Sequence, residues 1–327
     1  MPASVSRRPL LAGLGGLLAS PLAAEEAWPR STLRILVPFA PGGATDIAAR
    51  VLAPALQAEL GRNVVVENRP GGGGTIAAEA VARATDQHTL FLTSGSTQSV
   101  APALFPVLRY DPVKDMAPLC LLARVPHVLV VPRQLGVRDV PGLVARLKAE
   151  PGKHNFATSG AGSLPHLAGE LFRLQAGVEA TAIPFRGSAP AITALLQGDC
   201  SYMLDSLPST IGQIQDGSLL AIGAGTRTRI VAMPELVPIA EQGLPDFESY
   251  TWVALYATAN LPAAGLALAA EATARAMRQP EVQRRYAELG MEIANGGPAE
   301  LAALQRAEYE KWGAVIRQAG ITPEGGP

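Results

Sequence analysis

Hydrophobic and polar positions change period repeatedly along the first hundred residues. Short apolar runs with the composition of buried strands alternate with segments in which apolar residues recur at helical spacing. This βαβαβ succession predicts a largely parallel sheet with right-handed crossovers, and ligands of such sheets bind beyond the carboxyl ends of the strands. The expected elements are strands at 33–39, 64–68 and 89–92, a helix at 47–60 and an alanine-rich helix ending at Ala84.

A second cycle of the same pattern starts near Leu119 and predicts a second α/β unit. The expected elements are strands at 119–131, 154–157, 181–185, 201–205, 219–225 and 251–258 and helices at 140–149, 167–176, 189–197, 262–278 and 298–319. We therefore predict a two-lobed α/β fold, with lobe 1 formed by 31–125 plus 250–327 and lobe 2 by 126–249. Two crossing strands, near 119–131 and 250–258, would join the lobes as a hinge with the ligand cleft between them.

The first 24 residues have the pattern of an export signal. Arg7 and Arg8 precede a short apolar run and then small residues up to Ala24, which is typical of a twin-arginine or general secretory signal and too short for a membrane span. Cleavage there removes two positive charges and takes the formal net charge from -1 to -3. We expect a freely diffusing, soluble exported protein. With no basic run and 5% aromatic residues, nucleic-acid binding is not expected.

Glycine-containing turns connect predicted strands to helix starts at two places and form candidate anion sites. The first holds Gly42 and Gly43, and the second runs from Ser159 to Ser163. Backbone N–H groups at a helix start lack intrahelical partners and carry the positive end of the helix dipole, so a carboxylate can bind there. The alternative for the first loop is that its glycines serve only a tight turn.

Charged residues near these loops give further candidates. Arg186, in a third strand-to-helix turn, could pair with a carboxylate, or it is a surface arginine of that loop. Asp46 is placed to cap or lock the first helix turn, whereas Asp205 at a strand end could accept a hydrogen bond from a ligand. His166 begins a helix and would either touch the ligand or support the loop from behind.

Patterns for other chemistry are weak. No G-x-S-x-G frame, Walker lysine or complete dinucleotide fingerprint is present, and the histidines form no ligand cluster, so we expect neither metal nor cofactor. Ser159 or Ser163 with His166 and Asp205 remains the one catalytic set that folding could assemble. Cys120 and Cys200 lie in separate apolar contexts and are expected to be two buried thiols rather than a disulfide.

Six stretches occur in order along the chain: VPFAPGGATDIAAR at 37–50, VVVENRPGGGGTIAAEAVA at 64–82, YDPVKDMAPLCLLARVPHVLVV at 110–131, FATSGAGSLPHLAGELF at 156–172, PFRGSAPAITALLQGD at 184–199 and DSLPS at 205–209. Together they resemble the substrate-binding proteins of tripartite tricarboxylate transporters, also called the Bug family. The resemblance covers nearly all of the mature chain. It implies a periplasmic two-lobed receptor without catalysis, whose facing loops hold the carboxylates of a small organic acid.

The resemblance also implies a set of ligand-binding residues. Gln98 and Ala101 depart from the family pattern, which commonly has a histidine and an asparagine there, so the pocket is expected to differ. The residues carried over are Phe39, Gly42, Gly43 and Asp46 of the first loop, Ser159, Gly160, Ala161, Gly162 and Ser163 of the second, and Ser94, Ser96, Arg186, Gly187 and Asp205 of the remaining wall.

The sequence thus predicts a monomeric solute receptor that delivers a small organic carboxylate to integral membrane transporter subunits. Two alternatives stay open: a secreted hydrolase or transferase on the same fold, and a receptor that serves a sensor kinase. The ligand itself is not determined at this level, because dicarboxylates, tricarboxylates, aromatic acids, amino acids and neutral compounds all fit the pattern.

Overall fold

Strand β4 (Met116–Pro132) organises the molecule because it takes part in both halves of a ten-stranded sheet in this computed structural model, which describes residues 28–323 and Met1. Its first part pairs antiparallel with β9 (Tyr250–Thr258) and β10 (Glu292–Gly296). From His127 onward it pairs with β7 (Tyr202–Ser206) and β8 (Leu219–Ala224). The predicted export signal lies outside the described residues, Met1 apart.

The two halves of the sheet are built alike. In the first half, β1 (Leu33–Val37) lies between β2 (Val64–Asn68) and β3 (Thr89–Ser94), and both pairings are parallel. In the second half, β5 (Asn155–Thr158) lies between β6 (Thr181–Pro184) and β7, again parallel. The strand order is β2-β1-β3-β9-β4-β7-β5-β6, with β8 and β10 also pairing with β4. The predicted α/β class is confirmed, but the largely parallel sheet is not. Among the described strands four pairings are parallel and five are antiparallel, because β9, β4, β7, β8 and β10 return across the middle of the sheet in alternating directions.

Helices cover both faces of each half because the strands are apolar on both sides. On the first half, α1 (Ala44–Leu60), α8 (Ala263–Arg278) and α9 (Pro280–Glu288) share one core with the sheet, and α2 (Thr75–Ala82) shares another on the opposite face. The second half is covered in the same way by two helix pairs. These are α4 (Val140–Ala149) with α5 (Leu164–Ala176), and α6 (Ser188–Gln197) with α7 (Leu207–Gln215).

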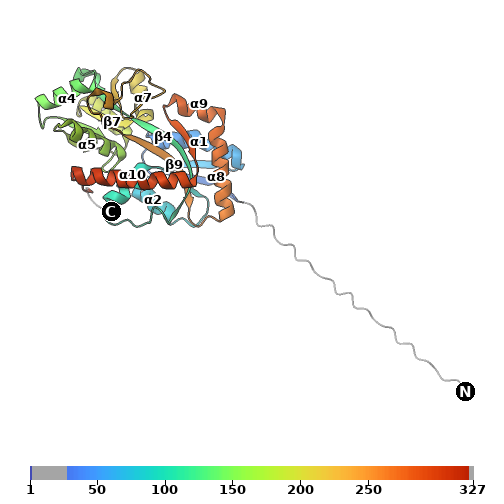
Figure 1. Ribbon diagram of the computed structural model, residues 1–327. Coiled ribbons are helices and arrows are strands. Elements are labelled where there is room, and N and C mark those ends of the chain that lie inside the picture. Colours follow the sequence, from blue (N-terminus) through green and yellow to red (C-terminus); the bar gives the residue numbers. More distant parts are fainter. Residues whose placement is uncertain (2–27, 324–327) are drawn as a thin grey trace.

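The C-terminal helix α10 (Pro298–Ala319) connects the two halves. Figure 1 shows it in red, crossing the molecule from beside α5 to beside α2. Trp312 and Ile316 of α10 pack with Leu164 and Leu167 of α5, and with Val100 from the segment after β3. A buried apolar cluster therefore ties the first half to the second away from β4.

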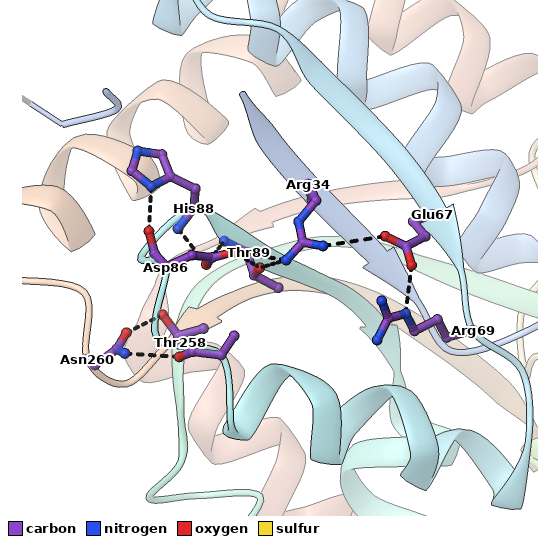
Figure 2. Close-up of polar contacts among 9 residues, drawn as sticks. Arg34, Glu67, Arg69, Asp86, His88, Thr89, Thr258 and Asn260 are labelled. Atoms are coloured by element: carbon purple, nitrogen blue, oxygen red, sulfur yellow. Dashed lines mark hydrogen bonds and ion pairs between the residues drawn. The ribbon is translucent and has the colours of Figure 1, made fainter. Parts of the chain in front are cut away.

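A polar cluster closes one end of the first half, at the turn before β3 (Figure 2). Asp86 accepts hydrogen bonds from the backbone N–H groups of His88 and Thr89, and its other oxygen accepts from Arg34 of β1. Burial acts to raise the pKa of Asp86, but these donors outweigh it and lower the pKa. The turn is held by an ionised carboxylate that joins β1 to β3.

The sequence patterns missed several elements. The short turn at Ser96–Val100, the helix α3 (Ala101–Leu104), α7, α9 and β10 were not expected. α9 carries its own signal, since Pro280 occupies the first helical turn and Val282 and Tyr286 are buried at helical spacing. The predicted elements did not take this helix-start signal of Pro280 into account.

The two cysteines are separate, as predicted. Cys120 lies in a core of the first half and Cys200 in a core of the second, and both are buried free thiols. Burial raises the pKa of Cys120 to about 12 and that of Cys200 to about 11. Thiols in this state are poor nucleophiles, so neither suggests redox or catalytic chemistry.

Candidate functional site

Hydrogen bonds from within the loop and from β2 fix the conformation of the loop between β1 and α1. Gly42 has φ +89°, a backbone conformation that L side chains rarely adopt. Its N–H donates to Asp46 Oδ2 at 3.0 Å, and Asn68 Nδ2 donates both to Asp46 Oδ1 and to the carbonyl oxygen of Phe39, at 2.9 Å each. The N-cap residue of α1 is Gly43, which has no side chain to cap the helix, so the first N–H groups of α1 remain open to a ligand.

Asp46 locks this loop rather than lining a cavity, in agreement with the capping role considered from sequence. Burial acts to raise its pKa, but hydrogen bonds from Arg50, Gly42 and Asn68 outweigh that effect and lower it. Both oxygens of the Asp46 carboxylate therefore accept hydrogen bonds from the protein. Its assignment as a ligand contact remains a prediction that the geometry does not favour.

Replacing Asp46 with alanine is expected to lower the free energy of unfolding by about 1–3 kcal/mol, because the amides of Gly42 and Asn68 lose their shared acceptor. Urea denaturation measures the change. Arg50→Ala is the matched control: it removes the ion-pair partner, whose side chain is 53% exposed, together with an exposed hydrogen bond to Asn68 Oδ1, and should cost less than about 1 kcal/mol. Equal losses in the two variants would show that the ion pair, not the loop, is what Asp46 stabilises.

The second loop, between β5 and α5, is built differently and reaches across to the first half. Ser163 is the N-cap of α5, where its hydroxyl accepts from His166 N and donates to the carbonyl oxygen of Gly160 at 2.8 Å. The backbone N–H of Gly162 donates to His166 Nδ1 at 3.1 Å. Ser96, from the turn after β3, accepts from the N–H of Leu164 at 2.9 Å. His166 therefore supports the loop, and Ser96 joins the loop to the other half of the sheet.

Four helix N-termini converge on one small inner cavity of about 50 Å³. They belong to α1, α5, α6 and α7, whose N-caps are Gly43, Ser163, Gly187 and Ser206. The partial positive charge of each N-terminus favours an anion in the shared space. The lining residues are Phe39, Ala40, Gly43, Ala44, Thr45, Ser94, Ser96, His127, Ser159, Ser163, Pro165, Gly187, Ser188, Asp205, Ser206, Thr251 and Val253.

A larger outer cavity of about 520 Å³ adjoins the inner one and shares five lining residues with it. Its walls are the glycine-rich turn at 71–74, the second loop and the third loop with Arg186. The shared residues are Phe39, Ala40, Ser159, Ser163 and Gly187. A ligand with one end in the inner cavity would extend its body into the outer one.

The structure brings most of the sequence-predicted residues to these two cavities and leaves three outside. Arg186 is exposed and reaches only the outer cavity, together with Gly160 and Ala161. Neither Gln98 nor Ala101 lines either cavity; Gln98 is buried, with its Nε2 at 3.4 Å from Met116 Sδ. The predicted residues on the inner cavity are Phe39, Gly43, Ser94, Ser96, Ser159, Ser163, Gly187 and Asp205, and those outside both are Gly42, Asp46 and Gly162.

His127 is the main lining residue that the sequence did not indicate. It lies on β4, fully buried, with Nδ1 at 2.7 Å from the hydroxyl oxygen of Ser249. Burial, with a smaller contribution from Lys311, lowers its pKa to about 3, so the ring is neutral. Ser206 and Thr251 also line the inner cavity and were not predicted. Ser206 could have been found from the sequence, because Pro208 marks the first turn of a helix at Leu207–Gln215 and Ser206 directly precedes it as the N-cap.

Among the described residues, Asp205 is the one acidic side chain that lines the inner cavity. Its Oδ1 accepts from the N–H of Ser206 at 2.7 Å and from the Ser206 hydroxyl at 3.3 Å. Burial raises the pKa of Asp205 to about 6, against the lowering effect of the polar groups of Ser188 and Ser206. The cavity thus combines four positive helix ends with a single buried carboxyl group.

Within residues 28–323, no group of histidine, cysteine, aspartate or glutamate side chains is arranged to hold a metal ion. In the same range, no helix combines the length and apolar character that crossing a bilayer requires. The inner cavity is instead lined by backbone ends, hydroxyl groups and apolar side chains, which is the composition expected of a site that recognises a small polar molecule by hydrogen bonds.

Comparison with known proteins agrees with this geometry. Residues 48–321 match the family described as the tripartite tricarboxylate transporter family receptor. The protein BugT of Bordetella pertussis is 34% identical over 305 residues, covering 93% of each chain. The structure of R. palustris Rpa4515 with adipate has 30% identity and a TM-score of 0.88, covering 91% of this chain and all of the other. MatC from Rhodopseudomonas palustris with bound malate has 32% identity and a TM-score of 0.83, covering 88% of this chain and all of the other.

These matches confirm the two predictions drawn from the resemblance, the fold and the family. The architecture is that of the periplasmic transporter and binding proteins found among the solved structures, at TM-scores of 0.83 to 0.88 for the first four. The family model covers most of the sequence, including three of the four helix N-termini at the inner cavity, those of α5, α6 and α7; it begins just after the first turn of α1. The chain belongs to the tripartite tricarboxylate transporter receptor family, the family of the Bug proteins.

Proposed function

We propose that this chain is an exported periplasmic receptor that binds a small organic carboxylate in the inner cavity and presents it to integral membrane transporter subunits. The convergence of the α1, α5, α6 and α7 N-termini carries the proposal, because each contributes up to about 2 kcal/mol toward a partly buried anion. Adipate and malate in the related solved structures are acids of this kind. The receptor acts as a monomer and needs no cofactor.

The proposal does not include catalysis. In a serine hydrolase triad an aspartate hydrogen-bonds the histidine that activates the serine. Here His166 Nδ1 accepts from a backbone amide, and Asp205 Oδ2 has no hydrogen-bond partner among the described residues. The arrangement supports a ligand site more strongly than a proton relay.

Closure of the receptor would involve the predicted lobes, 31–125 plus 250–327 and 126–249. The inner cavity takes lining residues from both sets, such as Gly43 and Ser163, so a bound acid contacts both. A ligand that interacts better with the closed arrangement shifts the population toward it. The membrane subunits would then recognise the closed receptor.

Native mass spectrometry of gently purified mature protein, followed by calorimetric titration of organic acids into ligand-stripped protein, tests the function. We expect a retained acid or a saturable one-to-one binder, and a stabilisation of about 2.7 kcal/mol when that acid is present at 100 times its dissociation constant. The acid should be recovered unchanged. Consumption of the acid would favour the enzyme alternative, and no binding across mono-, di- and tricarboxylates would remove the proposed function.

Arg186 is expected to bind the distal carboxylate of a dicarboxylic ligand from the outer cavity. Because its side chain is exposed, Arg186→Ala should weaken dicarboxylate binding by only about three- to tenfold and leave monocarboxylate binding unchanged. Titration calorimetry measures both. Arg138→Ala, an exposed arginine away from both cavities, is the control. A loss of the same size for monocarboxylates would place Arg186 on the proximal group instead.

A further inference from the structure

Two polar atoms at the inner cavity lack a hydrogen-bond partner among the described residues: Asp205 Oδ2 and His127 Nε2. Both side chains are almost fully buried, at 1% and 0% exposure. The other polar atom of each is satisfied, Asp205 Oδ1 by Ser206 and His127 Nδ1 by Ser249. Ser249 does not line the cavity.

An unpartnered buried carboxylate oxygen is costly, and it accepts hydrogen bonds only. No lysine or arginine is among the residues that line the inner cavity in the part of the chain described. The N–H of Ser206, at the start of α7, is already bonded to Oδ1. The Ser188 hydroxyl is close enough to act on the pKa of Asp205, but it makes no hydrogen bond to Oδ2. The protein therefore presents no cationic side chain to Oδ2 in this cavity, and a bound ligand can supply the donor.

We propose that Asp205 Oδ2 selects carboxylic acids that carry a hydrogen-bond donor, a hydroxyl or ammonium group, on the carbon next to the carboxylate held by the helix ends. This inference rests on the proposed function and narrows its substrate class. The inner cavity, at about 50 Å³, has room for a few water-sized groups, which suits a carboxylate with one substituted carbon. The rest of the ligand lies in the outer cavity.

Asp205 and His127 do not face the same ligand group. In the β4–β7 pairing, His127 is opposite Ser206 and Val128 is opposite Asp205, so the side chains of His127 and Asp205 point to opposite faces of the sheet. The selectivity therefore depends on Asp205 Oδ2 alone, which accepts a hydrogen bond from a hydroxyl or an ammonium group.

Calorimetric titration with matched triplets tests the inference on the full mature protein. Each triplet keeps one carbon skeleton and changes only the substituent: propionate, lactate and alanine; succinate, malate and aspartate; glutarate, 2-hydroxyglutarate and glutamate. One of the three carbon skeletons should match the length of the site. With that skeleton, wild-type protein should bind one donor-bearing acid about ten- to a hundredfold more tightly than the unsubstituted acid, as expected for a hydrogen bond to a charged group.

Asp205→Asn should reverse this selectivity, since its amide NH2 meets the ligand donor and the negative charge near the carboxylate is gone. We expect the donor-bearing acid to bind at least tenfold more weakly and the unsubstituted acid more tightly. Asp199→Asn, an exposed aspartate outside both cavities, controls for the change of charge. Equal affinities across the wild-type triplets, or an unchanged preference in Asp205→Asn, would overturn the inference.

The wild-type comparison decides the matter even if Asp205→Asn fails to fold. Binding of unsubstituted acids alone would leave the proposed function standing and reject the role of Asp205. Binding of no acid by protein that is folded by circular dichroism would reject the proposed function, and this inference with it.

Discussion

Gly43→Leu is expected to abolish carboxylate binding, with a rise in dissociation constant of more than about a hundredfold, while the protein stays folded. Gly43 has φ −84° and ψ 164°, an ordinary extended conformation, so a side chain there causes no backbone strain. A Cβ at this position would lie 4.0 Å from Ser188 Oγ and 3.9 Å from the carbonyl oxygen of Ala40, both of lining residues. A leucine therefore extends into a cavity of about 50 Å³ and fills it.

Gly42 provides the matched comparison one residue earlier. Its φ of +89° strains any L side chain, and a Cβ would meet only Ala189 Cβ, at 3.9 Å. Gly42→Ala should therefore cost about 1–2 kcal/mol of stability through backbone strain and leave a site that still binds. Gly43→Ala should bind within about threefold of wild type. Calorimetry and thermal melting measure both effects, and retained binding in Gly43→Leu would place the ligand outside the inner cavity.

The second large effect concerns the stability of the unliganded protein in acid. Replacing His127 with glutamine should make the protein less sensitive to acidification between pH 6.5 and pH 3. The pKa of His127 is lowered to about 3 by burial, whereas the unfolded chain has the ordinary value of 6.5. In that window the unfolded state binds a proton that the folded state does not, so stability is lost as pH falls, by on the order of 4 kcal/mol at pH 3.

Asp205 has the opposite effect over an overlapping range. Its pKa in the folded protein is about 6, against 3.8 when unfolded, because burial disfavours the charged form. The folded state therefore holds the extra proton, and stability is gained as pH falls from 6 to 3.8, by on the order of 3 kcal/mol. In wild type the two effects largely cancel between pH 4 and 6. Asp205→Asn should expose the full loss that His127 causes.

Urea denaturation of wild type, His127→Gln and Asp205→Asn from pH 4 to pH 7.5 separates these contributions. Other carboxylates with lowered pKa values, such as Asp46 and Asp86, lose stability in acid equally in all three proteins, so differences from wild type isolate the two cavity residues. We expect the His127→Gln curve to be shallower than wild type in acid and the Asp205→Asn curve to be steeper. Three parallel curves would mean that neither side chain keeps its shifted pKa in the folded protein.

Local patterns predicted what depends on neighbours in the chain. Both ends of the strand at 64–68 and of the helix at 140–149 were predicted correctly, and the ends of other elements within a few residues. The periodicity of apolar side chains and the glycine turns are local signals, which is why the sequence shows them. The polar α9 and the helix α7 were missed where prolines at their starts were not used. Glycine-rich loops before helices also indicated, from sequence alone, that two helix ends could bind an anion.

The sequence by itself determined the alternation of strands and helices, the two glycine loops and the family resemblance. Only the tertiary structure decided what faces the ligand, since the strand order brings β4 and β7 together and aims the α1, α5, α6 and α7 ends at one point. His127 lies in an apolar run with no local sign of function. Asp46 fits a ligand contact in the sequence, and only the hydrogen bond that its carboxylate accepts from Asn68 of β2 shows its role in the loop. Burial and hydrogen-bond partnership are set by residues distant in the chain, which is why neither could be read from the sequence near them.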